Sequence, residues 1–268
     1  MNRNELFSTN KFIQDCCSIA DYVGMSKRDF SQAIGLPFEC IDEPQGIISL
    51  HYIIESYKVL LSYTKDELLG TQEKPLPRGA IALMIKSACA EKTLSKALTA
   101  IDNVNRVCQS PIAANLILEK DIVRWQFSFV TKNSNHYLFA ITMLTCIANR
   151  MLSMLLKKEV PLLYISFKDD EPVNLCDYHF LYNCPVKFNQ NYNELVFDKA
   201  WLNKPVLCNY KDVEKQLRVP LSITSHSFDS LGLISQIKNI ISLYPRNQFP
   251  TQNELASELG ISIRTMQR

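Results

Sequence analysis

The strongest constraint on the fold of this chain is a stretch in which apolar and polar residues alternate. In segment 122–130 the apolar positions are Val123, Trp125, Phe127 and Phe129, and the polar positions between them are Arg124, Gln126 and Ser128. Successive side chains of a β-strand point to opposite faces of the sheet, so this pattern predicts a strand with one buried face and one face in water. A chain with such a strand contains a sheet, and an all-helical fold is excluded.

The segments around this strand predict helices and further strands. Apolar residues recur at helical spacing in segments 11–22, 50–63, 80–90, 93–107 and 136–157. Short runs of apolar, β-branched and aromatic residues predict strands at 113–118, 162–167, 186–188 and 195–197, the last two bracketing a turn-rich segment at 189–193. The sequence Glu-Lys-Asp joins strand 113–118 to the alternating strand, which predicts a hairpin. We therefore expect an α+β fold, in which helices pack on a small mixed or antiparallel sheet.

The length of the chain predicts more than one domain. Its 268 residues exceed the usual size of a single domain, and a content of 47% hydrophobic and 21% charged residues supports a sizeable core. A stretch with Pro205, Pro220 and a Ser/Thr-rich run has the composition of a linker. We place the boundary near Ser225, which predicts domains 1–225 and 226–268. The formal net charge of +2 gives no general argument for a polyanionic partner.

The nine cysteines indicate a reduced, cytoplasmic protein, because they are odd in number and no two have CxxC spacing. Cys176, His179 and Cys184 form a loose cluster whose spacing matches no common zinc pattern. Small buried thiols are the favoured interpretation, so we expect no metal site.

No N-terminal segment has the apolar core of a signal peptide. Segment 138–156 is long enough to span a membrane, but Asn149 and Arg150 lie well inside it. This favours a buried amphipathic helix, and we expect no membrane association.

The last residues of the chain have the pattern of two short helices joined by a tight turn. Thr251 and Glu254 have the spacing of a capping box, which predicts the start of a helix. Gly260 suits the left-handed conformation that ends a helix, and Ser262 suits the N-cap of a second one. Ala256 is small enough for the two helices to cross there. These features favour a helix-turn-helix over an ordinary helical hairpin whose charged face is merely solvated.

In a helix-turn-helix, the second helix enters the major groove of DNA with its first residues towards the bases. Arginine can bind guanine and glutamine can bind adenine through paired hydrogen bonds. The residues expected to contact DNA are Ser262, Arg264, Thr265, Gln267 and Arg268.

Segment 249–268, Phe-Pro-Thr-Gln-Asn-Glu-Leu-Ala-Ser-Glu-Leu-Gly-Ile-Ser-Ile-Arg-Thr-Met-Gln-Arg, resembles the start of the DNA-binding domain of AraC-type regulators. Leu-Tyr-Asn-Cys-Pro-Val-Lys-Phe at 181–188 and Asn-Glu-Leu-Val-Phe at 193–197 resemble the end of the effector-binding domain in one AraC subgroup. That subgroup includes ornithine-utilisation regulators and has an arabinose-binding-like effector domain. Segment 68–98 is similar to the middle of the same domain.

The resemblance implies a ligand-responsive transcription regulator. Its domain 1–225 would bind a small-molecule effector and form a homodimer, and segment 226–268 would begin the domain that reads promoter DNA. AraC-type DNA-binding domains carry two helix-turn-helix units, whereas this chain ends part-way into the first recognition helix. A short helix end is not stable alone, so we expect this polypeptide not to bind specific DNA tightly. No cofactor is expected.

The effector site is the part that the sequence defines least. Arg78, Trp125, His136 and Tyr137 are polar or aromatic residues beside apolar runs and could line a pocket, although each also fits a core or surface position. A ligand-free dimerisation or interaction module is the alternative. An enzyme is disfavoured, because the chain has no GxGxxG, GxxxxGK[ST], GxSxG or HExxH motif. Cys184, with His179 nearby, is the one nucleophile-like arrangement, and we expect no catalytic residue.

Overall fold

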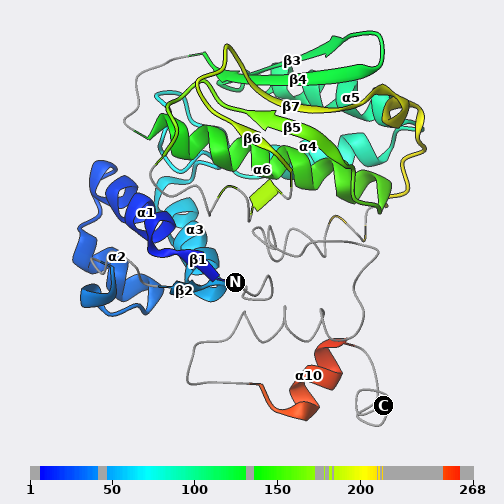
Figure 1. Ribbon diagram of the computed structural model, residues 1–268. Coiled ribbons are helices and arrows are strands. Elements are labelled where there is room, and N and C mark those ends of the chain that lie inside the picture. Colours follow the sequence, from blue (N-terminus) through cyan, green and yellow to red (C-terminus); the bar gives the residue numbers. More distant parts are fainter. Residues whose placement is uncertain are drawn as a thin grey trace. The chain divides into compact units, whose positions relative to one another are not determined.

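The computed structural model describes residues 7–41, 47–130, 136–172, 178, 181–182, 184–209, 211, 213 and 250–259 (Figure 1). The chain divides into two compact units. One comprises Met1–Val59 together with Thr224–Arg268, and the other comprises Leu60–Ile223. The division into domains 1–225 and 226–268 stays a prediction.

The N-terminal part of the chain contains the helices predicted at 11–22 and 50–63, observed as α1 (Asn10–Tyr22) and α3 (Leu50–Thr64). The division between the two units falls within α3, after Val59. Two short strands precede these helices, β1 (Phe7–Thr9) and β2 (Ile47–Ser49), and they pair in antiparallel fashion. The sequence did not predict this ribbon, because strands of three residues are too short to show a period.

The structure adds a helix that the sequence analysis did not predict, α2 (Lys27–Ile34). Its start is capped by Ser26, whose hydroxyl oxygen accepts a hydrogen bond from the backbone N–H of Asp29 at 3.1 Å. Its end is marked by Gly35, which has a φ of +72° in the left-handed region that favours glycine. These caps were legible in the sequence, but the helix is too short for its apolar period to stand out. A 3₁₀ turn follows at Phe38–Cys40.

The second unit is organised around a five-stranded sheet with the strand order β3-β4-β7-β5-β6. The strands are β3 (Ile112–Leu118), β4 (Ile122–Phe129), β5 (Leu162–Ser166), β6 (Val186–Lys187) and β7 (Asn193–Asp198). All neighbours are antiparallel except β5 and β6, which are parallel. The predicted α+β class with a small mixed sheet is confirmed, as is the hairpin of β3 and β4.

The strands β6 and β7 flank the predicted turn, but they are not neighbours in the sheet, because β5 lies between them. A turn signal in a sequence shows where the chain reverses. It does not show which strand the returning segment pairs with, since that depends on contacts far apart in the chain.

Three helices cover one face of this sheet: α4 (Ala80–Cys89), α5 (Leu94–Val107) and α6 (Tyr137–Leu156) (Figure 1). The apolar residues predicted to face inward from β4 are all at most 6% exposed. They meet the apolar stripe of α5, which consists of Leu94, Ala97, Leu98 and Ile101, all buried. The removal of these surfaces from water is the main source of stability of the unit, at about 25 cal/mol per Å² of apolar area.

Within the described residues, α6 is long and apolar enough to cross a membrane by length and composition. However, 61% of the qualifying window is buried inside the protein. Ile141, Leu152 and Leu155 are fully buried in the core that α6 shares with the sheet. The length and apolar character of α6 are therefore explained by its place in the core.

The loop between α3 and α4 is organised by two adjacent carboxylates. Asp66 is 2% exposed and accepts backbone hydrogen bonds from Leu68, Gly70 and Leu76 at 2.9, 2.9 and 2.7 Å. The side chain of Glu67 accepts backbone hydrogen bonds from Gly79 and Ile81 at the start of α4, at 2.6 and 2.7 Å. A carboxylate at a helix N-terminus satisfies its free N–H groups and interacts favourably with the helix dipole.

The C-terminal segment contains the predicted capping box. The Thr251 N–H donates to Glu254 Oε2 at 2.7 Å, and the Glu254 N–H donates to Thr251 Oγ1 at 3.3 Å. This box begins α10 (Gln252–Leu259), on which Leu255 and Ala256 are buried. The predicted turn at Gly260 and the second helix lie outside the described residues.

Replacing Asp66 with alanine tests the role of this loop. Asp66→Ala leaves three backbone N–H groups without their acceptor, so we expect the free energy of unfolding to fall by about 3 kcal/mol. Chemical denaturation followed by circular dichroism measures this change. Glu73→Ala, at an exposed position of the same loop, serves as the control and should change stability by less than about 0.5 kcal/mol. Equal effects of the two substitutions would contradict this role.

Candidate functional site

His136 and Tyr137 lie next to each other at the start of α6, where His136 is the N-cap residue. Tyr137 is half-buried, and its ring packs edge-on against Phe129 of β4 with 5.8 Å between ring centroids. Its hydroxyl oxygen accepts a hydrogen bond from Asn193 Nδ2 at 3.1 Å. Burial raises the pKa of Tyr137, so this hydroxyl is uncharged at neutral pH and keeps a proton that it can donate.

Asn193 connects this position to three strands of the sheet. It is 1% exposed and belongs to β7. Its Oδ1 accepts from the backbone N–H of Lys168 at 2.9 Å, just after β5, and its Nδ2 also lies 3.5 Å from the carbonyl oxygen of Phe127 on β4. A buried amide with partners on both of its polar atoms is held in one orientation, and it therefore holds the Tyr137 hydroxyl in place.

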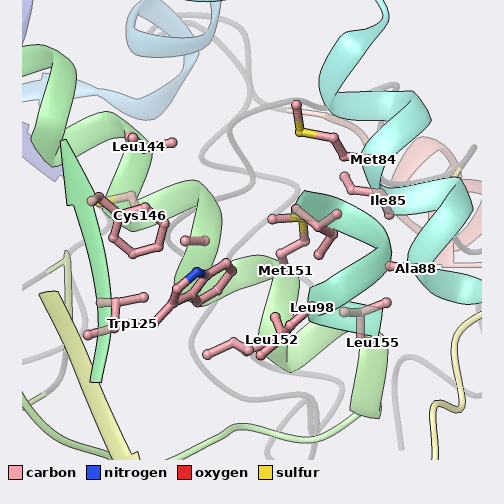
Figure 2. Close-up of a cluster of buried hydrophobic side chains, with 14 of the residues drawn as sticks. Met84, Ile85, Ala88, Leu98, Trp125, Leu144, Cys146, Met151, Leu152 and Leu155 are labelled. Carbon is pink, nitrogen blue, oxygen red and sulfur yellow. The ribbon is translucent and has the colours of Figure 1, made fainter. Parts of the chain in front are cut away.

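Trp125 lies in the apolar core, with 4% of its surface exposed. Figure 2 shows its indole beside Met151 and Leu152 of α6 and Leu98 of α5. Its ring also lies 4.8 Å from that of Phe127, measured between centroids. In the described structure this residue fills space between sheet and helices.

Arg78 lies on the loop before α4, and its side chain is exposed. Burial raises the pKa of the neighbouring Glu67, and the positive charge of Arg78 is among the factors that oppose this rise. The four predicted effector residues thus fall at three places: the start of α6, the core and an exposed loop. Their role in ligand binding stays a prediction.

A second polar cluster, which the sequence analysis missed, lies inside the core around Tyr182. This tyrosine is 3% exposed, and its hydroxyl lies 2.7 Å from Thr145 Oγ1 and donates to the carbonyl oxygen of Thr142 at 3.0 Å. The Cys146 thiol donates to the same hydroxyl at 3.2 Å. The Tyr182 ring packs against Phe167 with 6.0 Å between centroids. This cluster attaches the segment around residues 181–182 to α6.

Burial keeps the groups of this cluster uncharged. It raises the pKa of Cys146 to about 12 and raises that of Tyr182 well above its usual value. The sequence held only a weak signal for the cluster, namely threonines in an otherwise apolar helix, and nothing indicated that Tyr182 would reach them.

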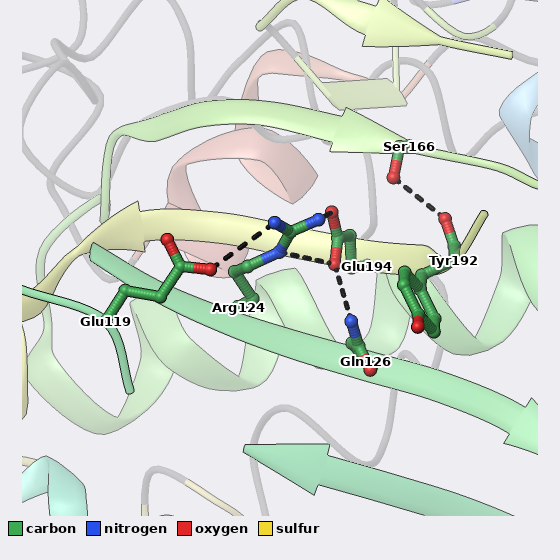
Figure 3. A network of polar contacts seen from close by, with 6 residues as sticks. All are labelled: Glu119, Arg124, Gln126, Ser166, Tyr192 and Glu194. Carbon is green, nitrogen blue, oxygen red and sulfur yellow. Dashed lines mark hydrogen bonds and ion pairs between the residues drawn. The ribbon is translucent and has the colours of Figure 1, made fainter. Parts of the chain in front are cut away.

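The other face of β4 carries an ion-pair network instead of the simple wet face that the alternation predicts. Figure 3 shows Arg124 of β4 facing Glu194 of β7, with Nη2–Oε1 at 2.7 Å and Nε–Oε2 at 3.0 Å. Gln126 Nε2 donates to the same carboxylate at 3.0 Å, and Glu119 lies 3.4 Å from Arg124 Nη1. The side chain of Glu194 is only 2% exposed, whereas that of Arg124 is 29% exposed. The period-2 pattern indicated the direction of these side chains, but not the partner strand that buries them.

Within this network the charges of Arg124 and Glu194 compensate each other. Hydrogen bonding to Glu194 raises the pKa of Arg124, so the guanidinium stays charged and fixed to the carboxylate. Beside it on the sheet, Lys187 Nζ lies 3.7 Å from the centroid of the Tyr164 ring, at the distance of a cation–π contact. On this face the ion pair joins β4 to β7, and the cation–π contact joins β6 to β5.

Most of the remaining predicted residues lie outside the part of the chain that the structure describes. Ser262, Arg264, Thr265, Gln267 and Arg268 lie outside the described residues, and so do Cys176 and His179. Cys184 is described, and burial raises its pKa to about 11. The nucleophile in cysteine chemistry is the thiolate, so this environment opposes such a role.

A comparison of the sequence with known protein families identifies the family of this chain. Residues 24–206 match the family of the N-terminal arabinose-binding domain of AraC transcription regulators. The chain belongs to this family. The match includes the whole five-stranded sheet and α4, α5 and α6, and the predicted family is thereby confirmed. This family is one of transcription regulators, which are not enzymes.

Other comparisons are more distant. No curated protein matches the chain. Among solved structures, the transcriptional regulator CdpR from Pseudomonas aeruginosa is 15% identical, with a TM-score of 0.40 over 95% of this chain and 76% of that chain. So distant a likeness adds nothing to the family assignment.

Glutamine in place of Glu194 tests the network on the outer face. Glu194→Gln removes the buried charge opposite Arg124, and we expect the free energy of unfolding to fall by about 2 kcal/mol. Glu119→Gln is the matched control: this partner of Arg124 is 47% exposed, so its loss should cost less than about 1 kcal/mol. Urea denaturation of both variants measures the difference, and a larger loss for Glu119→Gln would overturn this account.

The raised pKa of Cys184 predicts slow alkylation. At pH 7.5 we expect iodoacetamide to modify Cys184 about a hundredfold more slowly than an exposed cysteine, because very little thiolate is present. The rate should rise with pH up to about 11, provided that the fold is retained. Peptide mass spectrometry after timed quenching identifies the residue, and denatured protein supplies the unprotected rate. Rapid modification of the native protein at pH 7.5 would show a reactive cysteine instead.

Proposed function

We propose that this chain is the sensing and dimerising part of a ligand-responsive AraC-type regulator, together with the beginning of its DNA-binding domain. The observation that carries this proposal is the family match over residues 24–206, whose family is described as arabinose-binding. In this proposal domain 1–225 senses the effector and dimerises, and domain 226–268 begins the part that reads DNA. The protein is cytoplasmic and needs neither a membrane nor a cofactor.

The effector site that we propose lies at the start of α6, around Tyr137 and His136. The half-buried Tyr137 hydroxyl is oriented by Asn193 and can donate its proton to a ligand oxygen. Aromatic rings continue from it along β4, with Phe129 in edge contact and Trp125 deeper in the core. Such an apolar wall with a few oriented polar groups is typical of small-molecule sites. Arg78 lies at a separate place, on the exposed loop before α4, and its part in effector binding stays a prediction.

The DNA-reading role rests on the end of the chain. The capping box at Thr251 and Glu254 starts a helix of the expected length, with Leu255 and Ala256 buried as a first helix requires. In our proposal the helix that follows contacts promoter DNA through Ser262, Arg264, Thr265, Gln267 and Arg268. An effector then regulates transcription only if it binds two states of the dimer with different affinity.

The test is a thermal-shift screen of the purified chain with arabinose, other sugars and amino acids. A ligand at a hundred times its Kd stabilises the folded state by about 2.7 kcal/mol, which raises Tm by roughly 5 °C or more. We expect at least one compound to do so. In Tyr137→Phe the shift should shrink, because the hydroxyl that donates to the ligand is gone.

Tyr192→Phe is the control for this screen, since it removes the hydroxyl of a tyrosine whose side chain is 50% exposed. This variant should keep the full ligand-induced shift. A ligand whose shift survives in Tyr137→Phe would place the site elsewhere. If no compound raises Tm, the alternative of a ligand-free dimerisation module is favoured.

A further inference from the structure

The strand β3 forms one edge of the five-stranded sheet, and its outer side has no neighbouring strand among the described residues (Figure 1). Its sequence, Ile-Ala-Ala-Asn-Leu-Ile-Leu, contains no charged residue and no proline. Ile117 and Leu118 are 41% and 54% exposed. Natural proteins usually protect a free edge with charges, prolines or bulges, because an unprotected edge pairs with other strands. We therefore expect an apolar edge of this length to pair with another strand.

The hydrogen bonds at the two ends of the β3–β4 hairpin show which backbone groups point to that outer side. The Val130 N–H donates to the carbonyl oxygen of Pro111 at 2.9 Å, and the Glu119 N–H donates to that of Ile122 at 3.0 Å. Residues of an antiparallel strand alternate between those bonded to the neighbour and those whose groups point away. The odd-numbered residues of β3 therefore bond to β4, and the N–H and C=O groups of its even-numbered residues point outward.

The first of these outward residues already has partners inside the chain. The Ile112 N–H donates to Ser110 Oγ at 3.1 Å, and its carbonyl oxygen accepts from Asn105 Nδ2 at 2.8 Å. Asn105 is only 7% exposed, so this end of the edge is closed by a buried side chain. The outward groups that remain for a partner strand are those of Ala114, Leu116 and Leu118.

We propose that this edge pairs with β3 of a second copy of the chain, antiparallel and with Leu116 opposite Leu116 on the two-fold axis. In this register Ala114 lies opposite Leu118 of the second copy, and every outward N–H of one edge meets an outward C=O of the other. A register shifted towards Ile112 would need groups that Ser110 and Asn105 already occupy. Pairing thus joins the two sheets into one continuous sheet across the dimer. The inference rests on the proposed dimerisation and specifies its interface.

The side chains also fit this register. Residues directly opposite each other lie on the same face of the sheet, so leucine meets leucine and the small Ala114 meets the larger Leu118. The edge is complementary to itself without any charge to match, which favours an identical strand as the occupant. The opposite edge of the sheet is β6, which has only two residues and carries Lys187, so it offers a much poorer site for strand pairing.

A charge-swap experiment on the full chain tests the proposal. In Leu116→Lys two like charges face each other across the axis, and the same holds for Leu116→Glu, so each variant should dimerise at least about tenfold more weakly than the unaltered chain. A mixture of the two variants should form a heterodimer, because opposite charges then meet. Analytical ultracentrifugation measures the dissociation constants. Leu83→Lys, at a leucine of α4 that is 51% exposed, is the control and should leave the dimer unchanged.

The outcomes separate the interface from dimerisation itself. A monomeric unaltered chain would overturn both proposals. A dimer that both charged variants keep at full strength would overturn the β3 interface alone. If either charged variant fails to fold, Ala114→Pro decides: it removes an outward N–H without touching the bonds to β4, and an undiminished dimer would overturn the inference. Slow exchange of the Leu116 and Leu118 amide protons in the dimer, and fast exchange on dilution, would support it.

Discussion

The burial of one face of β4 under α4, α5 and α6 is the contact on which the rest of the second unit depends. The aromatic side chains of that face reach into the helix layer, and β4 pairs with β3 on one side and with β7 on the other. With the inner face committed to packing, polar side chains of β4 are confined to the other face. There Arg124 meets Glu194 of the neighbouring strand, so the hydrophobic arrangement and the ion-pair network follow from the same alternation.

Much of this architecture is legible in the sequence, because long periodic segments carry their own signal. The five longer helices and the hairpin of β3 and β4 are of this kind, and so is the capping box at Thr251. The short elements α2, β1 and β2 carry too few residues for a period to be recognised. The insertion of β5 between β6 and β7 is a long-range pairing, and no local pattern encodes it.

The candidate site was harder to predict than the fold. Residue type drew attention to Trp125 and Tyr137 alike, yet one is enclosed by core side chains and the other keeps a half-buried hydroxyl. What distinguishes them is the surroundings: Asn193 approaches Tyr137 from a strand far along the chain. The hydroxyl cluster around Tyr182 has the same origin, since its members come from α6 and from a segment well beyond it. Chemistry that is assembled from distant segments leaves little trace in a local sequence.

The adjacency of Asn193 and Glu194 joins the contacts on the two faces of the sheet. These consecutive residues of β7 point to opposite faces, one to the Tyr137 hydroxyl and the other to the Arg124 guanidinium. Both are nearly inaccessible to solvent and both are held by several hydrogen bonds, so neither can turn without moving the backbone between them. A single peptide unit thus connects the hydrogen bonds on the helix side of the sheet with the ion pair on its other face.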